Sequence, residues 1–181
     1  MRSITFFSAV MLSLFMLASC GGGKEQWAVY TSGEGGFSVR MPGKVDKTDK
    51  TEVTPFGKQK THFVTWKPSA MAINKFKLFQ VSYTDCPQKF IADTVLLDVM
   101  LDSSIRMRYR DFTEKADVQG ERIELNGYPG RAFIYDGKDD ITIVKQCITN
   151  GRKYDLTVIV KKDQGTNPEI SEFFNSFQAL K

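Results

Sequence analysis

Side chains that carry most enzymatic and metal chemistry are scarce in this chain of 181 residues. It has one histidine, His62, and three cysteines, of which Cys20 lies near the N-terminus. Acid–base and nucleophilic catalysis need a positioned partner, and His62 has no carboxylate or cysteine at partner spacing. The two other cysteines have no nearby histidine and give no metal-binding pattern. We therefore expect a non-enzymatic protein with no cofactor, and an exposed position for His62 in a strand.

Motifs that bind phosphate or activate a serine are missing as well. The glycine-rich residues 33–36 precede a predicted strand, so no helix N-terminus would face a phosphate there. Gly57-Lys58 lacks the upstream glycine of a P-loop, because position 52 is Glu. Ser32 lies in an ordinary turn, outside any G-x-S-x-G pattern. These absences make an unidentified hydrolase the least favoured interpretation.

No excess of one charge points to a polyanionic partner. Lys and Arg together number 25 and Asp and Glu 21, which gives a net charge of +4. The lysines of residues 44–60 alternate with acidic residues, as in a solvated edge strand. Arg106, Arg108 and Arg110 are spread around a predicted helix instead of forming one basic face. We therefore expect no nucleic-acid partner.

Acidic residues gather in two places, and neither has the spacing of a known cation site. Asp136, Asp139 and Asp140 could hold a hard cation weakly, but aspartate is also a common turn former. Asp98 and Asp102 lie one turn apart on a predicted helix, where we expect a solvated stripe. The sequence therefore predicts no metal site.

A long apolar run lies at the N-terminus, at residues 4–18, after the single charge of Arg2. A spanning helix needs about 20 such residues, so the run fits the apolar core of a signal peptide better. It ends in Leu17-Ala18-Ser19-Cys20, the pattern of a lipobox, in which small residues precede the cleavage point and the cysteine thiol receives the lipid. The predicted organisation is a lipoprotein signal peptide at 1–19, a flexible tether lipidated at Cys20 at 20–26, and a single folded domain at 27–181.

A lipidated Cys20 would anchor the protein to a bilayer of the cell envelope. Position 21 is Gly and not Asp, which by analogy with proteobacterial sorting favours the outer membrane, with the domain facing the periplasm or the surface. The alternatives are an uncleaved N-terminal anchor helix and a secretory signal that ends in a chance cysteine.

Cys86 and Cys147 are the cysteines of the predicted domain. Export favours disulfide formation, and an even pair fits an oxidising compartment. Two separate, half-buried thiols are the alternative, because one widely spaced pair is a weak signal and a reducing habitat would keep both reduced. The sequence leaves this choice open.

Alternation of apolar and polar residues with a period of two predicts a chain rich in β-strands. Strands are expected in the first half at residues 27–32, 37–41, 44–54, 58–66 and 75–84. The second half is expected to contain strands at 118–125, 128–135, 141–148 and 153–160. Asn126-Gly127 and Asn150-Gly151 match the type I′ turn, in which positive φ favours Asn and Gly. The second half therefore predicts four adjacent antiparallel strands.

Apolar residues at helical spacing predict two helices. Residues 90 to about 110 lack turn formers and predict one long central helix, with Leu97, Met100, Leu101 and Ser104 on one stripe. Near the C-terminus, residues 166–169 resemble a capping box with proline in the first turn, followed by an apolar stripe of Ile170, Phe173, Phe174 and Phe177. The expected fold class is α+β, an antiparallel sheet packed by the long helix and the short C-terminal helix.

Several of these segments, in this order, resemble the PsbP-like family, which includes the DcrB-type bacterial lipoproteins. They are Trp27 ahead of Gly35-Gly36-Phe37-Ser38-Val39-Arg40-Met41-Pro42, Tyr83-Thr84-Asp85-Cys86-Pro87 before the helix, Leu125-Asn126-Gly127-Tyr128-Pro129-Gly130-Arg131 in the central hairpin, and Phe173-Phe174-Asn175-Ser176-Phe177 near the end. The resemblance covers most of residues 27–181 and implies a PsbP-like α/β sandwich. It also implies a non-enzymatic accessory or assembly role, and it carries over no catalytic residue.

The expected function is that of a membrane-anchored envelope lipoprotein without enzymatic activity, which binds another envelope protein as an accessory or assembly factor. The alternative is a small-ligand-binding lipoprotein that uses a cleft between the sheet and the long helix, with Trp66, Tyr83 and Tyr128 as its aromatic lining. A pocket that combined His62 with a carboxylate and an exposed hydroxyl would favour a hydrolase instead.

Overall fold

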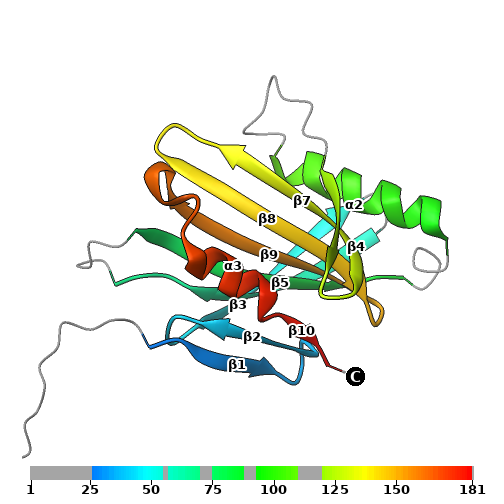
Figure 1. Cartoon of the computed structure of the whole chain (residues 1–181). Helices are drawn as coiled ribbons and strands as arrows, with labels where there is room; N and C mark the ends of the chain where they lie inside the picture. Colours follow the sequence, from blue (N-terminus) through cyan, green and yellow to red (C-terminus); the bar gives the residue numbers. More distant parts are fainter. Residues whose placement is uncertain (1–25, 55–56, 70–74, 88–92, 110–119, 181) are drawn as a thin grey trace, which may run out of the picture.

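The computed structural model describes residues 26–54, 57–69, 75–87, 93–109 and 120–180. In these residues the chain forms a seven-stranded antiparallel sheet, a three-stranded sheet and two α-helices, an α+β architecture (Figure 1). The predicted signal peptide at 1–19, the lipidation site Cys20 and most of the tether at 20–26 lie outside the described residues. None of the described helices is long and apolar enough to cross a membrane.

The large sheet, called here the main sheet, has the strand order β3-β4-β5-β9-β8-β7-β6. Its strands are β3 (Asp46–Thr54), β4 (Gly57–Trp66), β5 (Phe76–Asp85), β6 (Glu121–Leu125), β7 (Tyr128–Asp136), β8 (Asp140–Thr149) and β9 (Arg152–Lys161). The four adjacent antiparallel strands predicted for the second half are confirmed as β6 to β9. Their turns have positive φ at Asn126, Gly127, Asn150 and Gly151, as a type I′ turn requires. The two halves of the chain meet where β5 pairs with β9.

A separate small sheet consists of β1 (Ala28–Ser32), β2 (Phe37–Met41) and β10 (Gln178–Ala179), with β2 in the middle. The first two predicted strands therefore do not join the main sheet; they pair with each other, and β2 also pairs with the C-terminal end of the chain. The backbone N–H of Leu180 donates to the carbonyl of Gly36 at 2.8 Å and holds that end in place. The sequence pattern does not predict β10, which has two residues.

The C-terminal helix α3 (Pro168–Asn175) packs on the main sheet as its apolar stripe predicts. Its cap is Asn167, whose side-chain oxygen accepts a hydrogen bond from the Glu169 N–H at 3.1 Å. The expected capping box, with Thr166 as the cap, is therefore wrong by one residue. Ile170, Phe173 and Phe174 are buried, and Phe177 just beyond the helix is 0% exposed.

The other helix, α2 (Thr94–Tyr109), occupies the opposite face of the main sheet from α3 (Figure 1). Asp93 caps it by accepting hydrogen bonds from the N–H groups of Val95 and Leu96 at 2.8 and 3.2 Å. Met100 and Leu101 pack on Ile148 of β8. The expectation of one long central helix is wrong, because this 16-residue helix lies over β7 and β8, to one side of the sheet.

The two faces of the main sheet have different chemistry. On the face that α3 and the small sheet cover, Tyr154, Leu156, Val158 and Val160 of β9 are at most 1% exposed and form the centre of the main core. The residues that alternate with them on β9 point to the face of α2, where several buried side chains are polar. These are Ser82, Thr84, Arg131, Gln146, Asp155 and Thr157. The polar face holds α2 partly by hydrogen bonds, since Gln146 Nε2 donates to the Leu101 carbonyl at 2.7 Å.

Arg131 of β7 ties α2 to the sheet. Its side chain is only 5% exposed and donates to Asp98 Oδ1 at 2.6 Å and to Asp102 Oδ1 at 2.9 Å. A buried charge is tolerated when it is paired and hydrogen-bonded. The expected solvated stripe of Asp98 and Asp102 is therefore wrong, because both carboxylates turn toward Arg131. This ion pair lowers the pKa of Asp98.

Replacing both Asp98 and Asp102 by Asn should destabilise the fold by about 3 kcal/mol, because the buried Arg131 charge would lose its partners. Urea unfolding measures the change. The matched control is Arg122→Ala, since Arg122 also pairs with Asp98 but is 77% exposed. Loss of this exposed pair should cost less than about 0.5 kcal/mol. Equal losses in the two variants would contradict the role of Arg131.

The same ion pair has a defined pH dependence. Because Arg131 lowers the folded-state pKa of Asp98, the contribution to stability is complete above the ordinary carboxyl pKa of about 4. It is lost as the pH falls through the lower pKa of the folded state. The double Asn variant should lack this part of the acid dependence.

Candidate functional site

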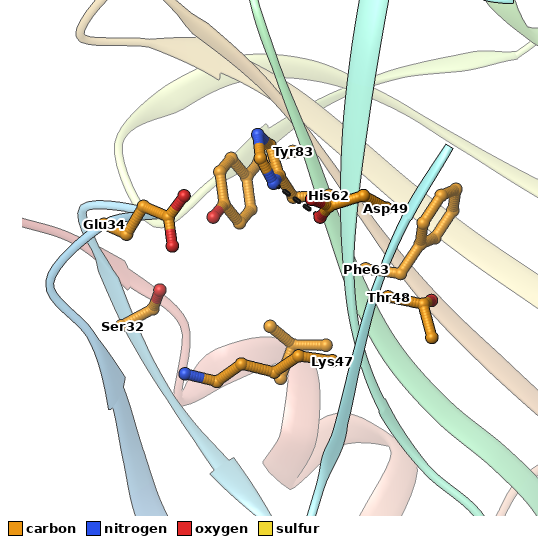
Figure 2. A pocket seen from close by; sticks show the side chains of 9 residues that line it. Ser32, Glu34, Lys47, Thr48, Asp49, His62, Phe63 and Tyr83 are labelled. Carbon is orange, nitrogen blue, oxygen red and sulfur yellow. Dashed lines mark hydrogen bonds and ion pairs between the residues drawn. The ribbon is translucent and has the colours of Figure 1, made fainter. Parts of the chain in front are cut away.

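A groove with a volume of about 290 Å³ lies at the seam between the small sheet and the β3–β5 side of the main sheet. Figure 2 shows Ser32 and Glu34 on the wall that the small sheet provides, facing His62, Asp49 and Lys47 of the main sheet. The lining residues are Ser32, Glu34, Lys47, Thr48, Asp49, His62, Phe63, Val64 and Tyr83. The groove therefore combines charged and polar side chains from both walls with the apolar lining residues Phe63, Val64 and Tyr83.

Strand register brings the residues of the main sheet together. Asp49 of β3 lies opposite His62 of β4, and His62 lies opposite Tyr83 of β5. Directly opposed residues of antiparallel strands have their side chains on the same face. Three residues that are far apart in the sequence therefore form one row across the sheet.

A hydrogen-bonded turn positions the other wall. The Gly35 N–H donates to the Ser32 hydroxyl at 2.9 Å, and the Gly36 N–H donates to the Gly33 carbonyl at 3.3 Å. Arg152 Nη1 donates to the Glu34 carbonyl at 2.5 Å. These contacts fix the backbone of residues 33–36, so the Glu34 side chain extends from a rigid support.

His62 has a carboxylate partner in this groove. Its Nδ1 lies 2.8 Å from Asp49 Oδ1, and its ring stacks on Tyr83 at 4.7 Å between centroids and 13° between planes. The Lys60 Nζ lies 2.6 Å from Asp49 Oδ2, and the hydrogen bonds from Lys60 and then His62 lower the pKa of Asp49. The expectation of an exposed histidine without a partner is wrong, because the partner lies across the strand pair and the His62 side chain is only 20% exposed.

The wall that faces the His62–Asp49 pair carries a hydroxyl, that of Ser32 (Figure 2). A nucleophile must lie within hydrogen-bond reach of its base, and no hydroxyl of the described residues makes such a bond with His62. The Ser32 hydroxyl accepts the Gly35 N–H, and Ser32 is 5% exposed. The groove thus joins His62 to Asp49, while the Ser32 hydroxyl is hydrogen-bonded to the turn.

Lys47 and Glu34 are the lining residues whose charges no ion pair engages within the described part of the chain. The Lys47 Nζ lies 5.7 Å from the centroid of the Tyr30 ring. Arg152, which is near Glu34, uses its Nε on Asp85 at 2.7 Å and meets only the backbone of Glu34. Burial and then the charge of Glu34 raise the pKa of Tyr83, so its phenol is neutral.

The two cysteines are apart from this groove and are both free thiols. Cys147 belongs to the main core, and Cys86 packs on the cluster under α2, on the other face of the sheet. Burial raises the pKa of Cys86 to about 11 and that of Cys147 to about 12. Both are therefore protonated and weakly nucleophilic at neutral pH.

Two of the aspartates near the turn between β7 and β8, Asp136 and Asp140, are paired with lysines. Asp136 Oδ1 lies 2.7 Å from the Lys162 Nζ, and Asp140 Oδ2 lies 2.6 Å from the Lys77 Nζ. Across the described ranges no group of three or more His, Cys, Asp or Glu side chains could hold a metal ion.

The predicted aromatic cleft between the sheet and the long helix is wrong in its location. Trp66 and Tyr83 belong to the main core, and Tyr128 packs against it, all on the face opposite α2. Tyr83 alone reaches the groove, which lies between the two sheets. Alternation predicts which residues of one strand share a face, such as Phe79 and Tyr83, but not which helix covers that face.

No family model and no curated protein matches the sequence. The structure is similar to the solution structure of cyanobacterial PsbP (CyanoP) from Synechocystis sp. PCC 6803, with a TM-score of 0.57 and 12% identity over 90% of this chain and 98% of that chain. It also matches a crystal structure from Bacteroides thetaiotaomicron VPI-5482, with a TM-score of 0.47 and 11% identity over 81% of this chain and 46% of that chain. At 12% identity, the similarity to CyanoP shows a shared fold and not a shared function.

Replacing Lys60 by Ala should raise the pKa of Asp49 toward the ordinary value of about 4, because the hydrogen bond from Lys60 is the main cause of its lowering. An NMR titration of the Asp49 carboxyl carbon measures this. Lys50→Ala is the control, since Lys50 pairs with Glu52 on the same strand and should leave Asp49 unchanged. An Asp49 pKa that did not respond to Lys60→Ala would show that the pair is not formed in solution.

Proposed function

Since the chain has the PsbP-like fold, we propose that it is a non-enzymatic lipoprotein of the cell envelope that binds another envelope protein as an accessory or assembly factor. Removal of residues 1–19 and acylation of Cys20 anchor it to a bilayer, with the outer membrane favoured by Gly21. The fold supports the architecture of this proposal and not its function, because one fold serves many functions. The observation that carries the binding function is the outer face of α2.

The outer face of α2 exposes apolar side chains. Val95, Leu96 and Val99 are 68, 39 and 54% exposed, and Val95 and Val99 lie one helical turn apart. Apolar side chains that gather on one face mark protein-binding sites, whereas scattered ones need no explanation. We call these three residues the α2 stripe. Its occupant in this proposal is an apolar surface of an envelope protein.

The α2 stripe stands on a firmly held helix. The Arg131 ion pairs and the hydrogen bond from Gln146 to the Leu101 carbonyl fix α2 to β7 and β8. A partner would therefore meet a preformed surface, and binding would not have to order the helix. This rigidity favours the α2 stripe over the single exposed residues elsewhere, such as Val53 and Ile134.

The anchor is tested by labelling cells with palmitate. The native chain should be labelled and should have lost residues 1–19, because the Cys20 thiol is the acyl acceptor in this proposal. Cys20→Ser should be unlabelled, and Cys86→Ser should be labelled like the native chain. Intact-mass measurement of detergent-extracted protein checks both points. An unmodified chain that begins at Met1 in that material would overturn the anchor.

The binding function is tested by cross-linking in cells and purification of the native lipoprotein. One envelope protein should be recovered, and a double Val95→Lys, Val99→Lys variant should reduce its recovery by about tenfold or more, since two charges would enter an apolar contact. Val53→Lys is the control, because Val53 is 87% exposed on the edge strand β3. Undiminished recovery with the double variant would exclude the α2 stripe, and repeated recovery of the lipoprotein alone would exclude the function.

A second candidate function is small-ligand binding, and the groove between the two sheets is the observation that favours it. Its volume of about 290 Å³ lies near the lower end of the range for ligand pockets, roughly 300 to 1,000 Å³. Polar groups from β1, β3, β4 and β5 converge on it (Figure 2). The charges that the groove leaves unpaired decide which ligand it could take.

A further inference from the structure

We propose that the groove between the two sheets binds a small zwitterion, a molecule with an ammonium and a carboxylate close together, such as a free α-amino acid. This inference rests on the second candidate function, small-ligand binding. It is independent of the α2 stripe, which lies on the other face of the main sheet.

The internal ion pairs of the groove leave one positive and one negative group for a ligand. Asp49 is neutralised by Lys60 and hydrogen-bonded to His62. The Lys47 ammonium and the Glu34 carboxylate carry the two charges that remain, as far as the structure describes the chain. They come from opposite walls, Lys47 from β3 and Glu34 from the turn after β1 (Figure 2).

These two charges select against a ligand that carries a single charge. A simple anion would be attracted by Lys47 and repelled by Glu34, and a simple cation would meet the reverse. A zwitterion satisfies both groups at once, with its carboxylate on Lys47 and its ammonium on Glu34. Complementary charges of this kind give specificity and fix the orientation of a ligand.

The two charged groups form no ion pair with each other in the described residues, although the hydrogen bond to Tyr30 and, less strongly, the charge of Glu34 raise the pKa of Lys47. The backbone at Glu34 is fixed by the hydrogen bonds of the turn and by Arg152. The Lys47 ammonium is placed beside the Tyr30 ring. A site that keeps opposite charges separated before the ligand arrives avoids much of the cost of ordering them on binding.

The size and the remaining lining fit a small molecule with an organic side chain. A groove of about 290 Å³ accommodates a single amino acid and not a folded partner. The apolar part of the ligand would lie beside the His62 ring, which is stacked on Tyr83 and is 20% exposed. The neutral Tyr83 phenol adds no further charge to the site.

The experiment is an NMR titration of the folded chain with free alanine, leucine, glutamine, glutamate and lysine. Each is compared with its N-acetyl derivative, which lacks the ammonium, and its carboxamide, which lacks the carboxylate. At least one free amino acid should shift the ring resonances of His62 and Tyr83 in a saturable way. The affinity for each blocked derivative should be lower by about tenfold or more, because the derivative loses one of the two charge contacts.

Variants assign the contacts to the two walls. Lys47→Gln and Glu34→Gln should each weaken binding by about tenfold or more, and both replace exposed side chains, so the fold should be retained. The matched controls are Lys50→Gln and Glu52→Gln, which remove charges of an exposed pair on the same strand that does not line the groove. Unfolding temperatures confirm that all four variants are folded.

The outcomes separate the ligand class from the function. Blocked derivatives that bind as tightly as the free amino acids would leave a small-ligand site but overturn the zwitterion. Binding that Lys47→Gln and Glu34→Gln did not weaken would overturn the proposed contacts and with them the inference. If no compound of the panel moved the His62 and Tyr83 resonances, the inference would fail, while recovery of a protein through the α2 stripe would be unaffected.

Discussion

The small sheet stays on the main sheet because the Phe37 ring is buried between them. Phe37 is 0% exposed, and its ring lies 5.9 to 6.0 Å from the rings of Tyr83, Tyr154 and Phe177. Aromatic burial and edge-to-face contact make such a ring worth several kcal/mol, about 3 to 5 when it is truncated. The turn with Ser32 and Glu34 directly precedes Phe37 and is held further by the Tyr154 hydroxyl on the Gly35 carbonyl at 2.9 Å. The groove therefore depends on the packing of Phe37, which keeps its two walls together.

Local patterns predicted much of the fold, because they act within a few residues. The alternation in β9, the Asn-Gly turns and the apolar stripe of α3 each follow from neighbouring side chains and backbone preference. The pairing of β5 with β9 and of β2 with β10 joins distant segments, and alternation does not say which strands are neighbours. The side position of α2 depends on Arg131, whose partner on the helix no periodicity identifies.

Part of the groove, the pairing of Asp49 with His62, could have been predicted from the sequence. The predicted hairpin closes where Thr54 pairs with Gly57, and counting back from that turn places Asp49 opposite His62. Counting residues from the turn would therefore have predicted Asp49 as the partner of His62. Glu34 and Lys47 face each other only after the small sheet has packed on the main sheet, and no spacing along the chain contains that information.

The pairing of β5 with β9 also determines when folding can finish. The main core can form only when residues 76–85 have paired with residues 152–161. The contact between the Phe37 and Phe177 rings likewise needs the C-terminal end of the chain. Contacts between distant segments form late and slow the folding of a chain. A growing polypeptide therefore stays open until nearly all of it has been made. Until then the edges of β5 and β9 have no partner, and such unpaired edges can pair with other chains.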